Sequence, residues 1–105
     1  MISMRLLACS IVLGAAAFAQ SKTDTSDGQK LFEKKCSICH ASETSERRIG
    51  PSLKGVKDGR LPGGRSATRD AVLKQLNDGG NGMPVYRELL SDAEKDSLAK
   101  YVLTL

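Results

Sequence analysis

The 105-residue sequence has few of the side chains that build a large core or a catalytic site. It contains no tryptophan, two phenylalanines, two tyrosines, one histidine and three cysteines. A structural zinc site needs four nitrogen or sulfur ligands, and too few histidines and cysteines follow residue 19 to provide them. No internal repeat, strand alternation, phosphate-binding glycine loop or nucleophile arrangement is present, so the sequence carries no recognisable enzyme motif.

The longest apolar run, residues 6–18, is too short to span a membrane, because a transmembrane helix needs about 20 apolar residues. A short basic segment precedes this run, and Ala17-Phe18-Ala19 gives the small-x-small pattern of a signal-peptide cleavage site. We predict a signal peptide over residues 1–19 and export to the periplasm or the outer face of the cytoplasmic membrane. No stable anchor would remain after cleavage; a retained anchor and a lipoprotein signal at Cys9 are the alternatives.

The remaining residues, 20–105, are expected to form a single small domain with a thin core. Their aromatic side chains are Phe32, Tyr86 and Tyr101. A chain of this size with so few large side chains buries little apolar area of its own. A buried cofactor would supply the missing area and would then be structural as well as functional.

One motif brings two thiols and an imidazole together, Cys36-Ser37-Ile38-Cys39-His40. Positions three and four apart share one face of a helical turn, so Cys36, Cys39 and His40 can all meet one flat ring. Each thiol can form a thioether with a porphyrin vinyl group, and the adjacent imidazole can bind the iron. The motif predicts one covalently attached haem c.

Other interpretations of this motif account for less of it. A thioredoxin-like dithiol would follow a strand in a βαβ unit, whereas the flanking sequence is helical or loop-like. A plain disulfide between Cys36 and Cys39 is possible in an exported chain, but it gives His40 no purpose. Haem attachment uses all three side chains.

The sequence before the motif predicts a helix that leads into it. Residues 20–25 are polar and are expected to form a loose tail, after which Ser26 and Gln29 form a capping box at a helix start. Apolar residues that include Phe32 then continue along one side as far as Cys36.

Two more helices are predicted after an irregular segment over residues 41–66, which is rich in turn residues. A short amphipathic pattern over residues 71–76 ends at the glycines that follow it. Ser91 and Glu94 form a second capping box, and apolar residues then recur at helical spacing. The predicted fold class is all-α, with three to four short helices around the bound haem.

The second axial ligand of the iron can be argued by elimination. An electron-transfer haem needs a donor opposite the histidine, and Met83 is the one methionine after residue 19. Three glycines within residues 79–82 would let the backbone approach a ring, and Pro84 stiffens the exit of this loop. A lone methionine is more often core filler, but the glycine-rich loop favours a ligand. We predict that His40 and Met83 bind the metal.

With these features, the chain resembles the class I monohaem cytochromes c, small exported electron carriers whose few helices wrap one covalent haem. The resemblance rests on the haem motif, on Gly50-Pro51-Ser52-Leu53-Lys54-Gly55, on Gly82-Met83-Pro84 and on the order of the helices. It implies that His40 is the proximal ligand, that the Pro51 carbonyl orients its ring, and that Met83 is the distal ligand. It also places Leu53 among the residues that contact the cofactor.

The resemblance further implies how the first and last helices meet. In the family, a glycine and an aromatic residue on the first helix cross an aliphatic and an aromatic residue on the last. The matching residues are Gly28, Phe32, Leu98 and Tyr101. The absence of tryptophan and the short middle segment depart from the family pattern, which points to a small bacterial type and leaves the residues that bind the haem propionates unassigned.

Two strong axial ligands limit the chemistry of such a haem. Because substrate cannot reach an iron whose axial positions are filled, the haem can change oxidation state but not readily activate oxygen or peroxide. We expect a soluble, monomeric electron carrier rather than an enzyme, with redox proteins as donor and acceptor and no nucleic-acid partner. The alternatives are a haem subunit of a larger dehydrogenase or oxidase and, more weakly, a peroxide- or gas-binding haem protein.

Basic residues are concentrated between Arg47 and Arg69, where seven of them accompany a single acidic residue, Asp58. This segment lies between the two predicted ligand segments, so it could surround an exposed haem edge and dock on an acidic partner surface. The alternative is a loop that is merely solvated by its charges.

Overall fold

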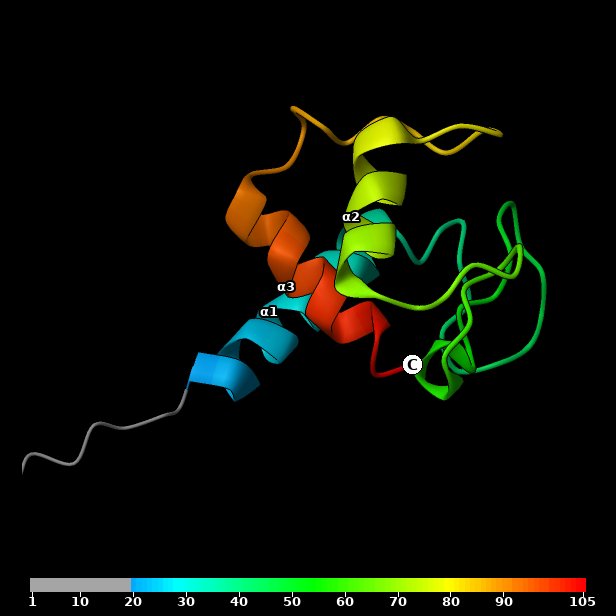
Figure 1. Cartoon of the computed structure of the whole chain (residues 1–105), viewed down its shortest axis with the longest axis horizontal. Helices are drawn as coiled ribbons and strands as arrows, with labels where there is room; N and C mark the ends of the chain where they lie inside the picture. Colours follow the sequence, from blue (N-terminus) through cyan, green and yellow to red (C-terminus); the bar gives the residue numbers. More distant parts are fainter. Residues whose placement is uncertain (1–19) are drawn as a thin grey trace, which may run out of the picture.

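The computed structural model describes residues 20–105, with side chains from residue 25 onward. Three α-helices form one part of the molecule and a long loop forms another (Figure 1). The helices are α1 (Gln20–Lys35), α2 (Arg69–Asp78) and α3 (Asp92–Val102), and one 3₁₀ turn, η1 (Val56–Asp58), lies within the loop. The described residues contain isolated bridges but no β-strand, which confirms the all-α fold class.

Helix α1 begins earlier than the sequence predicted, so the expected loose tail over residues 20–25 is wrong. No glycine or proline lies between residue 20 and Gly28, so no helix-breaking residue stops α1 from extending toward its N-terminus. Ser26 lies inside the helix, and the Gln29 amide donates to the Glu33 carboxylate at 3.3 Å instead of closing a cap.

Helices α1 and α3 cross in close contact near the middle of the molecule (Figure 1). Phe32 and Leu98 are each 1% exposed, and the Phe32 and Tyr101 rings meet edge to face with their centroids 5.4 Å apart. Gly28 permits this approach, because a Cβ there would lie 2.8 Å from the Ser97 carbonyl carbon. The crossing that the resemblance implied is present.

Side-chain caps start both later helices. Ser91 Oγ accepts from the Glu94 N–H at 3.1 Å, and the Glu94 carboxylate accepts from the Ser91 N–H at 2.9 Å, which confirms the predicted capping box. The bond that the carboxylate accepts from the Ser91 N–H favours its ionised form and lowers the pKa of Glu94. At the start of α2, Thr68 Oγ1 accepts from the Ala71 N–H at 3.1 Å, a cap that the sequence analysis did not identify.

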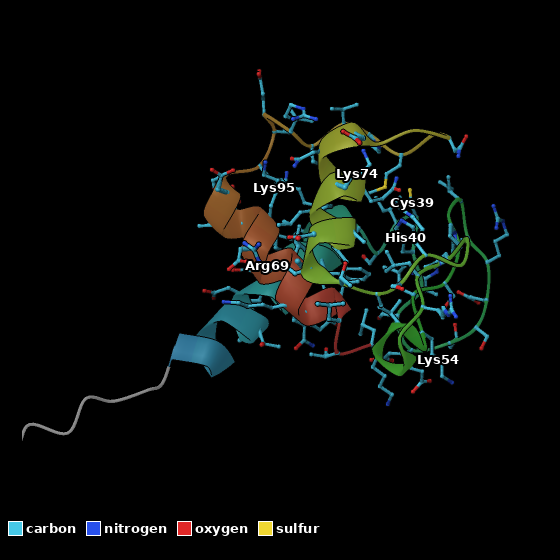
Figure 2. The ribbon with its side chains drawn as sticks, viewed as in Figure 1. Cys39, His40, Lys54, Arg69, Lys74 and Lys95 are labelled. Carbon is cyan, nitrogen blue, oxygen red and sulfur yellow. The ribbon has the colours of Figure 1, made fainter. Side chains whose placement is uncertain are left out.

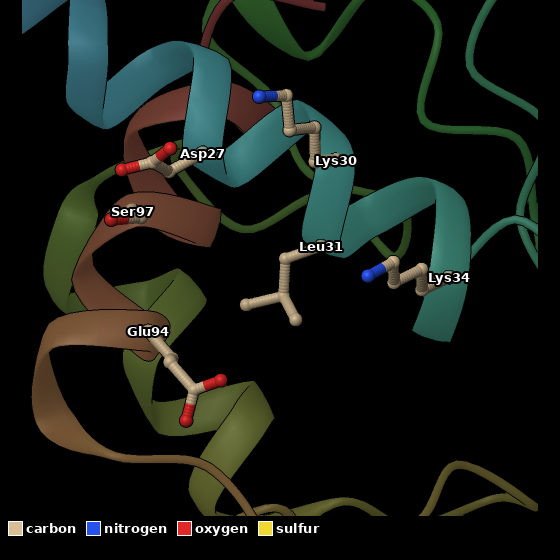
Figure 3. Close-up of a pocket in the computed structure, with 6 residues that line it drawn as sticks. All are labelled: Asp27, Lys30, Leu31, Lys34, Glu94 and Ser97. Atoms are coloured by element: carbon tan, nitrogen blue, oxygen red, sulfur yellow. The ribbon is translucent and has the colours of Figure 1, made fainter.

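A shallow cleft of about 230 Å³ lies between α1 and α3 (Figure 3). Its lining contains charged residues of both signs, Asp27, Glu94, Lys30 and Lys34, together with Leu31 and Ser97. None of the predicted haem-binding residues belongs to this cleft.

No helix within residues 20–105 is long and apolar enough to cross a membrane. The predicted signal peptide, residues 1–19, lies outside the described residues.

Candidate haem site

The haem motif continues the last turn of α1. The Cys36 N–H donates to the Phe32 carbonyl at 2.8 Å, and the His40 N–H donates to the Cys36 carbonyl at 2.9 Å. Cys36 and Cys39 are free thiols, not partners in a disulfide. Burial, with a smaller contribution from the neighbouring Cys39, raises the pKa of the Cys36 thiol to about 11. The two thiols therefore lie near one another on a single turn of chain.

Residues 50–53 run back alongside the motif and hold its imidazole. His40 Nδ1 lies 2.7 Å from the Pro51 carbonyl oxygen, which can only accept, so Nδ1 carries a proton and, in the neutral ring, Nε2 has the free lone pair. The Gly50 N–H donates to the Cys39 carbonyl at 2.7 Å, and the Leu53 N–H donates to the Ala41 carbonyl at 2.9 Å. The bond to the Pro51 carbonyl fixes the tautomer and the orientation of the His40 ring, and the two backbone bonds hold residues 50–53 against the motif.

Position 50 needs a glycine because its backbone lies close to the His40 ring. A Cβ at Gly50 would lie 2.8 Å from His40 Cε1 and 3.0 Å from the Cys39 carbonyl oxygen, too close for a real side chain. Leu53, which the resemblance placed at the cofactor, is half-buried against the hydrophobic core. Its contact with a haem stays a prediction.

A tight turn presents Met83. Asn81 and Gly82 both have positive φ, 52° and 88°, and the Gly80 and Met83 backbones exchange two hydrogen bonds of 3.0 Å. Positive φ at both central residues defines a type I′ turn, for which Asn-Gly is the favoured pair. The glycines in this loop therefore serve the turn itself, and the Met83 side chain lies half-buried against the core.

Gln75 on α2 contacts this loop, and the sequence analysis did not identify it. Its Nε2 lies 3.0 Å from the Gly79 carbonyl oxygen and 3.5 Å from Met83 Sδ. An amide N–H is therefore directed at the sulfur that we predicted as the second iron ligand. The only sequence signal was its position on the predicted amphipathic helix, and a polar residue there has no distinctive pattern.

Tyr86 brings the loop that contains Met83 next to the haem motif. Its N–H donates to the Leu76 carbonyl at 2.8 Å, and its hydroxyl lies 3.5 Å from the Lys35 carbonyl oxygen. Burial, followed by the nearby thiols of Cys36 and Cys39, raises the pKa of the Tyr86 phenol. The fold thus places a residue that follows Met83 beside both thiols.

Lys95 on α3 makes hydrogen bonds both to α2 and to the loop that follows Met83. It is 6% exposed, and its Nζ donates to Asn77 Oδ1 at 2.8 Å and to the Arg87 carbonyl at 3.1 Å. Asp92 Oδ1 lies 3.4 Å from the same nitrogen, so the buried charge is paired as well as hydrogen-bonded. Figure 2 shows Lys95 next to the loop that follows α2.

These residues fit a covalently bound haem. Figure 2 shows Cys39 and His40 away from the crossing of α1 and α3, between the loop after α2 and the long loop of residues 41–68. The site offers two free thiols, an imidazole held by one nitrogen only, and a thioether. Within residues 20–105, no group of three or more His, Cys, Asp or Glu side chains is arranged to hold a metal ion.

Comparisons with known proteins identify the family of this chain. The family described as cytochrome c oxidase, cbb3-type, subunit III, matches residues 23–102. Cytochrome c6 from Synechococcus sp. (strain ATCC 27167 / PCC 6312) is 30% identical over 97% of this chain and 86% of its own length. Cytochrome c6 from Pyropia yezoensis is 33% identical over 89% of this chain and 81% of its own.

A solved structure extends the likeness to the fold. Cytochrome c6 from the diatom Phaeodactylum tricornutum superposes with a TM-score of 0.61 at 32% identity, covering 77% of this chain and 92% of that one. The chain belongs to the class I monohaem cytochromes c, electron-transfer proteins that carry one covalently bound haem c. The predicted family, fold and cofactor are thereby confirmed.

Proposed function

We propose that the protein carries one electron at a time on a haem attached through Cys36 and Cys39 and ligated by His40 and Met83. The observation that carries this proposal is the 2.7 Å contact between His40 Nδ1 and the Pro51 carbonyl. A histidine that donates its second N–H to a carbonyl has its tautomer and orientation fixed, and its other nitrogen becomes a better metal ligand. When bound, the haem supplies a centre that alternates between ferrous and ferric iron.

The remaining residues suit electron transfer better than catalysis. The Met83 thioether is a soft donor that favours ferrous iron, and the turn before it holds it in place. With His40 opposite, no axial position would be open to a substrate, so we infer that the protein is not an enzyme. The sequence pattern of residues 1–19 supports export to the periplasm or the outer face of the cytoplasmic membrane.

Covalent attachment is the first test. We expect haem to stay with the protein when acid and acetone are used to extract the holoprotein, made in a periplasm that can mature c-type haem. The matched variant Cys36→Ala/Cys39→Ala lacks both thiols but keeps His40, and its haem should pass into the solvent. Colour leaving the unaltered protein would show that thioether attachment is wrong.

We propose that the partner docks on the basic loop, defined here as residues 47–69. Two of its charges are already paired, Arg48 with Glu46 at 2.9 Å and Arg69 with Asp96 at 2.7 Å. Arg48 also donates to the Ser37 carbonyl at 2.6 Å, so part of the basic loop lies directly against the haem motif. An acidic partner surface would complement the positive charges of this loop.

Ionic strength tests the docking surface. The rate constant for electron transfer to a physiological partner should fall as salt rises, because the Debye length is only about 10 Å at 0.1 M. Arg47→Glu/Arg60→Glu should slow the reaction at low salt by roughly tenfold or more. The control Lys30→Glu/Lys34→Glu makes the same charge change on α1, at the cleft in Figure 3, and should have little effect. A flat salt profile, or equal effects of the two pairs, would exclude the basic loop.

A second candidate is a haem subunit of an oxidase complex. The description of the matching family, a subunit of a cbb3-type cytochrome c oxidase, favours it. A subunit would co-purify with its partner chains from solubilised membranes, whereas a free carrier would be recovered alone.

A further inference from the structure

Arg65 belongs to the basic loop, yet its side chain contacts the site. Its Nη2 donates to Gln75 Oε1 at 2.7 Å. The Nε2 of the same amide lies 3.0 Å from the Gly79 carbonyl oxygen and 3.5 Å from Met83 Sδ. A chain of two contacts therefore links a surface arginine to the methionine sulfur.

The chemistry of its neighbours allows the Gln75 amide only one orientation. A guanidinium group only donates and a backbone carbonyl only accepts, so the amide oxygen faces Arg65 and the NH₂ group faces Gly79 and Met83. The bond from Arg65 is assisted by its charge, which makes it stronger than one between neutral groups. Without Arg65, the amide oxygen would lose this partner, and the broad terminal torsion of glutamine would let the group turn toward water.

The backbone presents Arg65 from a closed loop rather than a loose one. The Leu61 N–H donates to the Arg65 carbonyl at 2.8 Å, and the Ala67 N–H donates to the Gly59 carbonyl at 2.9 Å. Leu61 itself is buried in the core and anchors this loop. Arg65 can therefore hold the amide without a large loss of backbone freedom on forming the contact.

We propose that Arg65 is a positioning residue. It holds the Gln75 side chain so that an amide N–H of Gln75 points at Sδ of Met83, the proposed iron ligand. A hydrogen bond to the sulfur withdraws electron density from the thioether and stabilises ferrous iron relative to ferric iron. This inference rests on the proposed function, because it requires that Met83 binds the iron. A surface arginine then contributes to the reduction potential through a contact, in addition to any charge that it offers to a partner.

A double-mutant cycle on the holoprotein tests this inference. The four proteins are the unaltered chain, Arg65→Ala, Gln75→Leu and the double variant. The readouts are the midpoint potential by redox titration and the weak near-infrared band that methionine ligation gives to ferric haem. Arg65→Ala should lower the potential and shift the band, and most of both changes should disappear in the Gln75→Leu background. Arg65→Lys, which keeps a charged donor, should restore much of the effect.

The controls separate contact from charge. Arg60→Ala removes an equal charge from the same loop and should leave the band where it is. Arg65→Ala could instead shift the potential by the same amount in the unaltered chain and in the Gln75→Leu background. The Arg65 charge would then act through space, so the positioning role would be wrong while ligation by Met83 would stand. If the unaltered protein lacks the band, Met83 is not a ligand and the proposed ligation itself fails.

Discussion

Replacing Phe32 with alanine should lower the free energy of unfolding of the holoprotein by about 3–5 kcal/mol. The Phe32 side chain is 1% exposed, and it lies where α1 crosses α3, with its ring edge to face with Tyr101. Truncation removes the buried ring and leaves a cavity that two rigid helices cannot easily close. Since small domains are stable by only about 5–15 kcal/mol, this loss is a large share of the total.

Denaturant titration measures this effect, and the chain offers a matched control. Leu89 is 69% exposed, so Leu89→Ala also truncates a large apolar side chain but should change stability by no more than about 0.5 kcal/mol. The conservative variant Phe32→Leu should fall between the two. A loss for Phe32→Ala that is no larger than the loss for Leu89→Ala would contradict the packing described here.

Elements with a strong local signal could be predicted from the sequence. The capping box of Ser91 and Glu94 needs only residues three apart, and α3 begins there. The glycines after Asp78 end α2 for an equally local reason, since Gly79 serves as its C-cap. The local pattern gave a wrong prediction at α1. Ser26 and Gln29 match a capping box, but the helix already begins at Gln20 and both residues lie inside it.

The haem motif could be predicted, because its three reactive side chains are adjacent in sequence. The residues that surround it could not, since their contacts join distant parts of the chain. Arg65 and Gln75 meet because a closed loop packs against α2, and the buried amine of Lys95 lies in a helix where a solvent-exposed lysine would be ordinary. The Asn81-Gly82 turn did have a local signal, the favoured pair for a type I′ turn, which the sequence analysis did not use.

Met83→Ala should abolish the near-infrared band of methionine-ligated ferric haem and lower the reduction potential. The structure holds Met83 at the end of a turn closed by two hydrogen bonds of 3.0 Å, with a Gln75 N–H directed at its sulfur. No other methionine follows residue 19, so no second thioether from this part of the chain can replace it. Loss of a soft donor removes the preference for ferrous iron, which lowers the potential.

Two further variants make this test specific to the sulfur. Val85→Ala truncates an exposed side chain in the same loop and should leave both the band and the potential close to those of the unaltered protein. Met83→His offers the iron an imidazole in place of the thioether, so it should keep both axial positions filled but also lose the band and lower the potential. A spectrum of Met83→Ala identical to that of the unaltered protein would mean that the second ligand is another group.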